Sequence, residues 1–179
     1  MRRLVPMRQL VAHAVGGGWG HDAPTNTTER VAVIRGADFP AVALGDVSHL
    51  PIRWEERKKL LSRLLQPGDL VLEISGGTSD RPTGRTVFAS RRLLDGIGAP
   101  TIPASFCRLV RIDVAQADPK YVYWWLQGMY AGGRTWAYQN RSTGIANFQF
   151  EHFLDTEVVE LPPIEEQRGI AATLGPATK

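Results

Sequence analysis

Two short stretches of the sequence gather side chains that can bind phosphate groups and the edges of nucleic-acid bases. Residues 78–92 place four arginines among glycines and prolines: Arg81, Arg85, Arg91 and Arg92. Residues 134–143 have the sequence RTWAYQNRST. Arginine pairs with guanine or phosphate through two hydrogen bonds, and asparagine or glutamine pairs in the same way with adenine. We expect both stretches to be loops, although an ordinary solvated loop has a similar composition.

No comparable pattern indicates catalysis. A common type of metal-dependent nuclease needs an acidic residue followed by Glu/Asp-x-Lys. The nearest candidate is Asp69 with Glu73-Ile74-Ser75, where serine replaces the lysine. We therefore interpret Asp69 as a turn residue and Glu73 as a strand residue at the surface. Gly16 to Gly20 follow an expected strand, but no helical pattern follows them, so a dinucleotide-binding loop is not indicated.

Metal and thiol chemistry lack a pattern as well. The histidines have no ligand spacing: His13, His21, His49 and His152. Cys107 is the only cysteine, so neither a disulfide within the chain nor a cysteine-based zinc site can form. Because Cys107 lies in an apolar stretch, we expect a buried, inert thiol. We predict no catalytic residues, no metal and no cofactor.

Composition indicates an ordinary globular domain. The chain has 179 residues, of which 43% are hydrophobic and 22% charged, with a net charge of +3. Residues 1–113 carry 16 basic and 11 acidic groups, against 5 and 7 in residues 114–179. This mild basic bias fits a polyanionic partner, and an ordinary soluble protein almost as well. No apolar run reaches the roughly 18–20 residues of a membrane span, so we expect a cytoplasmic protein without membrane contact.

The hydrophobic pattern predicts strands and helices in one mixed α+β domain. We expect strands at residues 3–15, 31–35, 70–74, 104–112 and 156–161. One helix is expected over residues 53–66, where leucines recur every three to four positions. A second helix should begin at Asp118-Pro119, a capping residue followed by a first-turn proline, and end at Gly132. Residues 146–155 should form a short helix or turn, and a last helix should begin at Ile164.

The C-terminal part of the chain carries the most specific motif. Leu161-Pro162-Pro163-Ile164-Glu165-Glu166-Gln167-Arg168, then Ile170-Ala171, follows a strand and a small-residue turn, Ser142-Thr143-Gly144. Earlier come Gly16 to Gly18, the run LQPGDLVL at 65–72 and an aromatic helix at 121–129. Together these features resemble the target recognition domain of the specificity (S) subunit of type I restriction–modification enzymes. The resemblance covers nearly the whole chain.

The resemblance implies an α+β target recognition domain, residues 1–161, with a mixed β-sheet and flanking helices. Residues 162–179 would begin a conserved spacer helix. Such a protein is non-catalytic and recognises one half of a bipartite target in double-stranded DNA. It directs separate methyltransferase (M) and restriction (R) subunits. Because a full S subunit has two recognition domains, the chain resembles a fragment or a half-subunit, and a half-subunit would form a homodimer.

We predict that the two arginine-bearing stretches share one DNA-binding face. The candidate DNA-binding residues are Arg81, Arg85, Arg134, Gln139, Asn140 and Arg141. The candidate partner-binding residues are Ile164, Gln167, Ile170 and Ala171. An alternative is a docking module that binds a methyltransferase with little DNA affinity of its own. A catalytic nuclease or methyltransferase is disfavoured, because the necessary motifs are missing.

Overall fold

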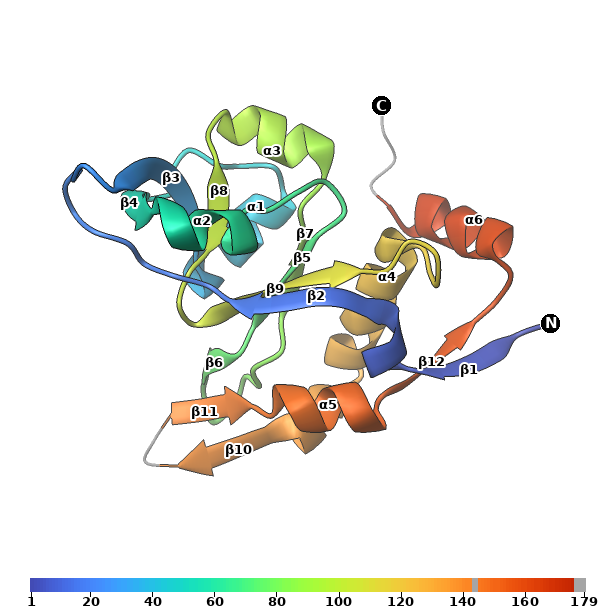
Figure 1. Cartoon of the computed structure of the whole chain (residues 1–179). Coiled ribbons are helices and arrows are strands. Elements are labelled where there is room, and N and C mark those ends of the chain that lie inside the picture. Colours follow the sequence, from blue (N-terminus) through green and yellow to red (C-terminus); the bar gives the residue numbers. More distant parts are fainter. Residues whose placement is uncertain (143–144, 176–179) are drawn as a thin grey trace.

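The computed structural model describes residues 1–142 and 145–175 of the chain (Figure 1). Within these residues the strands form four sheets, one of which lies at the centre of the packing. This central sheet is antiparallel, in the order β2 (Val11–Gly16), β9 (Cys107–Ile112), β5 (Leu70–Glu73) and β7 (Thr86–Phe88). The α+β fold class predicted from the sequence is confirmed.

The central sheet is buried on both faces. Successive side chains of a strand point to opposite faces. Leu70 and Leu72 of β5 belong to one core cluster, and Val71 between them belongs to the cluster on the other face. In β9, Val110 likewise packs in the first cluster and Leu109 in the second. Burial on both faces explains why these strands are apolar along most of their length.

One face of the central sheet is covered by α4 (Pro119–Ala131) and α5 (Phe150–Thr156). The two-stranded sheet of β1 (Arg3–Pro6) and β12 (Val158–Leu161) packs in the same cluster. The predicted start of α4 is confirmed, because Asp118 Oδ1 accepts a hydrogen bond from the Tyr121 amide at 2.9 Å. The last helix, α6 (Ile164–Leu174), packs against α4.

The other face of the central sheet carries α1 (Phe39–Ala43), after the short 3-10 turn η2 (Gly36–Asp38), and α3 (Arg91–Ile97). Next to them lies a sheet in the order β4 (Ile52–Glu56), β3 (Thr28–Ile34) and β8 (Thr101–Pro103), with α2 (Arg57–Arg63) against it. This sheet is mixed, since β3 runs antiparallel to β4 and parallel to β8.

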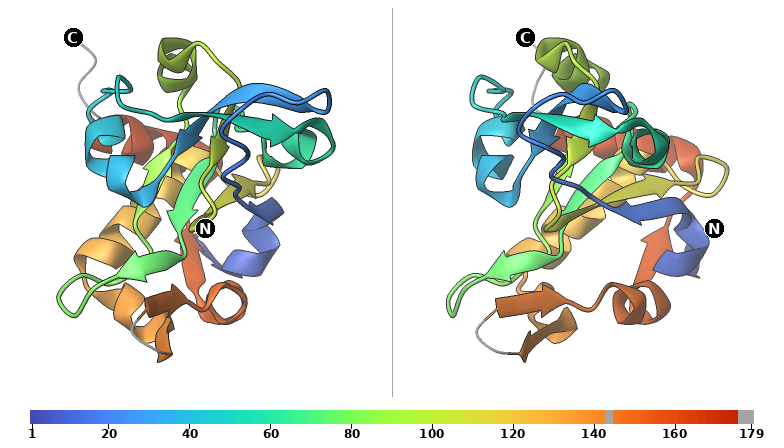
Figure 2. Two further views of the ribbon diagram at one scale, coloured as in Figure 1. Left: turned by 90° about the vertical axis from the view of Figure 1, so that its left-hand side faces the viewer. Right: turned by 60° about the vertical axis from the view of Figure 1, so that its left-hand side comes forward.

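A three-stranded sheet forms the end of the molecule opposite α3 (Figure 2). It contains β10 (Gln139–Ser142), β11 (Ile145–Phe148) and β6 (Ser75–Gly77), in that order. The 3-10 helix η3 (Arg134–Tyr138) connects α4 to β10. This sheet joins a segment from the middle of the sequence to one from its C-terminal third.

The helix predicted over residues 53–66 is wrong in its first part. Residues up to Glu56 form β4, which pairs with β3 so that Trp54 lies opposite Arg30. The helix α2 begins only at Arg57. The ladder satisfies the backbone hydrogen bonds of β4, and this tertiary pairing outweighs the helical spacing of the leucines.

Other predicted boundaries also change. The strand predicted over 3–15 is interrupted by a 3-10 turn, η1 (Met7–Leu10), because its two halves pair in different sheets. The strand predicted from 104 begins at Cys107, after a turn. Residues 134–142 form η3 and β10 and not a loop, and residues 145–156 form β11 and α5. Thr143 and Gly144 lie outside the described residues.

Gly16, the last residue of β2, and Gly17, the next residue, differ sharply in how closely the chain packs against them. A Cβ atom on Gly17 would lie 2.1 Å from the carbonyl oxygen of Ala104, whereas one on Gly16 would meet nothing within 4 Å. We therefore expect Gly17→Ala to lower the free energy of unfolding by about 1–3 kcal/mol. Gly16→Ala, the matched control, should change it by less than about 0.5 kcal/mol. Urea unfolding of both variants measures the difference, and equal stabilities would contradict this packing.

Candidate nucleic-acid interface

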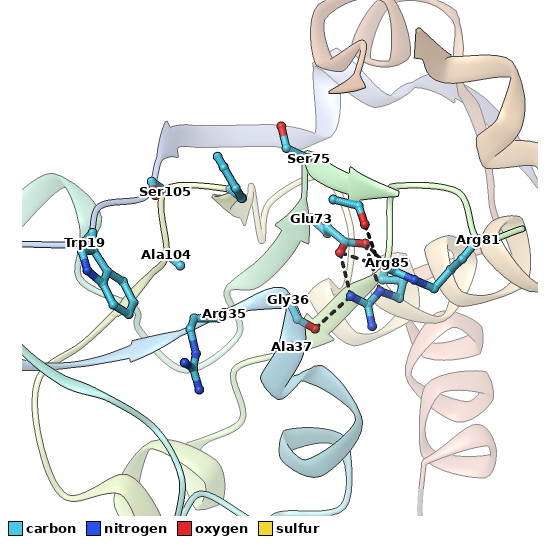
Figure 3. A pocket seen from close by; sticks show the side chains of 12 residues that line it. Trp19, Arg35, Gly36, Ala37, Glu73, Ser75, Arg81, Arg85, Ala104 and Ser105 are labelled. Atoms are coloured by element: carbon cyan, nitrogen blue, oxygen red, sulfur yellow. Dashed lines mark hydrogen bonds and ion pairs between the residues drawn. The ribbon is translucent and has the colours of Figure 1, made fainter. Parts of the chain in front are cut away.

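A cleft of about 370 Å³ opens beside the end of β5. The residues that line it come from β5, β6 and four connections between strands, so segments distant in the sequence meet there (Figure 3). Its charged and aromatic lining residues are Trp19, Arg35, Glu73, Arg81, Arg85 and Phe106. Of these, only Arg81 and Arg85 were predicted site residues.

The buried carboxylate of Glu73 organises this cleft. Glu73 is 2% exposed. Arg85 donates two hydrogen bonds to it, from Nη2 at 2.6 Å and Nε at 2.9 Å, and Arg81 Nη1 donates at 3.1 Å. Arg85 Nη2 also donates to the Gly36 carbonyl at 2.9 Å, and Arg81 Nη2 to the Gly76 carbonyl at 2.6 Å. Two guanidinium groups on one carboxylate leave the cluster with a formal charge of +1.

The interpretation of Asp69 and Glu73 as surface residues is wrong, because both carboxylates are buried. Asp69 is 1% exposed and accepts hydrogen bonds from Arg111 at 2.7 and 2.8 Å. A carboxylate loses its hydration when buried, and arginine is the side chain best suited to replace it with paired donors. The hydrogen bonds from Arg111 and Arg85 to their carboxylates raise the pKa of both guanidinium groups.

Arg81 and Arg85 differ in their access to solvent. The Arg81 side chain is 35% exposed at the rim of the cleft, whereas the Arg85 side chain is 19% exposed. The Arg85 guanidinium also lies over the Phe39 ring, 5.3 Å from its centroid. Arg85 therefore forms part of the wall, and Arg81 is the more accessible cation.

The two stretches selected from the sequence meet in the structure. Strand β11 pairs on one side with β10 and on the other with β6, where Ala146 lies opposite Gly77. The Gln139 Oε1 atom accepts a hydrogen bond from the Thr83 amide at 3.0 Å. Asn140 is exposed. The backbone of Arg141 lies opposite Ala146 in the ladder, and its side chain lies outside what the structure describes.

Arg91 and Arg92 are separate from this surface. They begin α3, where the Ser90 hydroxyl accepts a hydrogen bond from the Leu93 amide at 3.1 Å. Helix α3 and the β10–β11 hairpin lie at opposite ends of the molecule (Figures 1 and 2). Of the first arginine-bearing stretch, the segment around Arg81 thus lies on the same side as the β10–β11 hairpin, whereas Arg91 and Arg92 do not.

Arg134 is tied to a second buried carboxylate. Glu157 is 2% exposed and pairs with the Arg134 guanidinium. It also accepts hydrogen bonds from Trp125 Nε1 at 2.8 Å and from the Tyr138 hydroxyl at 2.9 Å. The Arg134 side chain nevertheless remains 50% exposed. It fixes η3 to the chain before β12 while keeping part of its surface in solvent.

The four candidate partner residues divide between the two sides of α6. Gln167 is 1% exposed: its Oε1 accepts from the Asp118 amide at 2.9 Å and its Nε2 donates to the Pro162 carbonyl at 2.8 Å. Ala171 is buried as well. Ile164 is 38% exposed, and Ile170 is half-buried. Gln167 and Ala171 therefore hold α6 on the domain, and Ile164 offers the most accessible apolar surface of the four.

Sequence reasoning missed Trp19, Arg35 and Phe106. Arg35 follows β3, and its guanidinium donates two hydrogen bonds to the Asp38 carboxylate, at 3.0 and 2.8 Å. Trp19 was seen only as part of a glycine-rich loop, and Phe106 as part of a strand. An exposed aromatic residue in a tight turn was the available signal for Phe106, but it required the correct start of β9.

The described residues contain no group of three or more histidine, cysteine or acidic side chains placed to bind a metal ion. Within the same residues, no helix has the length and apolar character needed to cross a membrane.

Three solved structures share this arrangement of sheets and helices. The S subunit of the type I restriction–modification system from M. genitalium aligns with 97% of this chain at a TM-score of 0.61 and 12% identity. The second structure concerns complex assembly and conformational transition of the type I R-M system. A chain from it aligns with 96% of this chain, at a TM-score of 0.57 and 18% identity. The HsdS subunit from Thermoanaerobacter tengcongensis aligns with 96% of this chain, at a TM-score of 0.52 and 16% identity.

The chain has the fold of part of a type I S subunit. It spans less than two fifths of those chains, 38%, 37% and 36% of their respective lengths. No family model matches the sequence, and no curated protein matches it either. The likeness is therefore one of three-dimensional structure, and the S-subunit fold seen here carries the arginine-lined cleft beside its β10–β11 hairpin.

The Glu73 cluster should contribute strongly to stability. In Glu73→Gln, two guanidinium groups lose their shared counter-charge at a buried position, so we expect the free energy of unfolding to fall by about 3 kcal/mol or more. Glu29→Gln is the matched control: this side chain is 51% exposed, and its nearest cation is 4.0 Å away. That variant should lie within about 0.5 kcal/mol of the parent protein. Urea denaturation tests both, and similar losses would refute the special role of Glu73.

Cys107 is fully buried, and loss of hydration raises the pKa of its thiol to about 12. At pH 8 a group of that pKa is a thiolate in about one molecule in ten thousand, against roughly a quarter for a free cysteine. We expect an aromatic disulfide reagent to label the native protein at least about a hundredfold more slowly than the urea-unfolded chain. The absorbance of the aromatic thiolate that the reagent releases measures both rates. Labelling of the native protein as fast as that of the unfolded chain would contradict a buried, inert thiol.

Proposed function

We infer that the chain acts as a recognition domain of a type I S subunit and binds one half of a bipartite target in double-stranded DNA. Residues 1–161 would be the recognition domain, and residues 162–179 would begin the spacer helix. The observation that supports this most is the contact between two polar, arginine-bearing stretches across the β10–β11–β6 sheet. The S-subunit fold supports the same function.

Each candidate residue has a role that suits its surroundings. The accessible cations Arg81 and Arg134 would contact phosphates, as would Arg141. Asn140 is exposed and free to form two hydrogen bonds with an adenine edge. Gln139 already accepts a hydrogen bond through Oε1, so it would support the hairpin and offer its Nε2 donor. Arg85 would act indirectly, by holding Glu73 and thereby Arg81 in place.

The domain would supply no catalysis of its own. Methylation and cleavage would belong to the M and R subunits, and this chain would provide the DNA address within a cytoplasmic complex. Helix α6 would contact the M subunit through Ile164 and the accessible part of Ile170. Gln167 and Ala171 would keep that helix docked on α4. As a half-subunit, the chain would pair with a second copy to assemble two recognition domains.

A docking module with little DNA affinity is the second candidate. It is favoured by the engagement of the main cations: Arg81 and Arg85 share Glu73, and Arg134 pairs with Glu157. These ion pairs reduce the positive potential of the surface. Measured affinity for DNA separates the two functions.

Anisotropy of a labelled duplex at low salt tests DNA binding directly. We expect measurable affinity that falls steeply with salt, because each phosphate contact releases condensed counterions. In Arg141→Ala the slope of log K against log salt should decrease in magnitude by about one. Asn140→Ala should weaken binding to the preferred sequence by about 1–3 kcal/mol and leave that slope unchanged.

Arg92→Ala is the matched control for the arginine variant. It removes the same charge from an exposed position on α3, at the opposite end of the molecule from the β10–β11 hairpin. This variant should bind DNA as the parent does. Absence of DNA binding at every salt concentration would refute DNA recognition and favour the docking module. Cleavage of the duplex by the pure chain with Mg²⁺ would refute a non-catalytic role.

A further inference from the structure

We propose that the arginine-lined cleft binds a single nucleotide that projects from DNA, with its base against Phe106 and Trp19 and its phosphate near Arg81. This proposal rests on the DNA-binding function proposed above and adds a site to it. It concerns the cleft beside the end of β5 and not the surface of the β10–β11 hairpin.

The size of the cleft decides between a nucleotide and a double helix. Its volume of about 370 Å³ lies near the lower end of the range for small-molecule sites, roughly 300–1,000 Å³. A duplex, whose major groove alone is about 12 Å wide, cannot enter such a space. One nucleotide with an unstacked base is of suitable size.

Phe106 offers an exposed aromatic face on a rigid support. Its side chain is 60% exposed, although most phenylalanines of this chain are buried. The surrounding turn is closed by a hydrogen bond from the Cys107 amide to the Ala104 carbonyl at 2.9 Å. The Phe106 carbonyl accepts from the amides of Ile74 at 2.9 Å and Ser75 at 3.3 Å. The backbone that carries the exposed ring is thus fixed at the cleft, so little backbone freedom is left to lose on binding.

Trp19 supplies a second aromatic ring on the opposite side of the cleft from Arg81 and Arg85 (Figure 3). It is 39% exposed. The Arg53 guanidinium lies 4.6 Å from the centre of the indole ring, and Arg53 Nε donates to the Trp19 carbonyl at 2.9 Å. These contacts fix the ring. Aromatic side chains stack with any base, since every base has a π-face.

The charges of the cleft suit a phosphate. Arg81 and Arg85 share the single carboxylate of Glu73, which leaves a formal charge of +1 at this end. Neither Arg81 Nε nor Arg85 Nη1 donates to any residue in the described part of the chain. Unused guanidinium donors beside an aromatic surface are the combination that recognises a nucleotide.

A bulged nucleotide tests the site, because it costs less to extrude than a paired base. Three labelled duplexes of equal length and randomised sequence are compared by anisotropy at low salt: fully paired, with a one-nucleotide adenine bulge, and with an abasic residue in the bulge. The abasic bulge bends the duplex but has no base. We expect the adenine bulge to bind at least about fivefold more tightly than the other two.

Phe106→Leu keeps an apolar side chain and removes the ring, so it should abolish most of the fivefold preference while paired DNA still binds. Leu61→Ala is the control: this residue is 85% exposed on α2 and does not line the cleft. It should retain the preference. Equal affinity for the adenine and abasic bulges would overturn the nucleotide site and leave duplex recognition standing.

Failure of all three duplexes to bind would refute duplex recognition, and free dAMP then decides about the cleft. Quenching of tryptophan fluorescence by dAMP in the parent protein, lost in Trp19→Phe and weakened in Phe106→Leu, would keep a site for a free nucleotide. Absence of quenching would overturn the nucleotide site as well.

Discussion

Buried carboxylates paired with arginine determine the local geometry of this domain. A buried acidic group needs an opposite charge and several hydrogen bonds, or it would not remain ionised. Asp69, Glu73 and Glu157 are each no more than 2% exposed, and each is held by at least one arginine. Removing Arg111 would leave the Asp69 carboxylate buried without a cation, and removing Glu73 would leave Arg81 and Arg85 without their shared counter-charge. These pairs therefore hold both ends of β5 and the start of β12 in place.

The same pairs determine how the candidate interface is charged. Glu73 positions Arg81 at the rim of the cleft, and Glu157 positions Arg134 at the start of η3, which leads into β10. Each carboxylate cancels part of the charge that it orients. The surface therefore depends on where its donors point more than on a strong positive potential. In the proposed function, this arrangement would favour discrimination between binding sites over non-specific attraction to polyanions.

Local patterns predicted much of the fold and little of the site. The cap at Asp118, the apolar runs around Val71 and the motif after Leu161 depend on neighbouring residues, and the structure has the expected elements there. Strand β4 and the buried state of Glu73 depend on partners far away in the sequence: Trp54 lies opposite Arg30, and Glu73 needs Arg85. A charged residue looks the same in a sequence whether it is solvated or paired, so the cleft could not be found there.

Helix α4 connects the two ends of the molecule that the proposed function requires. At its N-terminus, the Asp118 amide donates to Gln167 of α6, the helix proposed to contact the M subunit. At its C-terminus, η3 leads directly into β10 of the candidate DNA surface. Its 13 residues span about 20 Å without a proline inside the helix. Because Val122, Leu126 and Met129 are buried along its length, α4 is firmly packed on the domain. The hairpin proposed to bind DNA would therefore keep a constant position relative to the helix proposed to contact the M subunit.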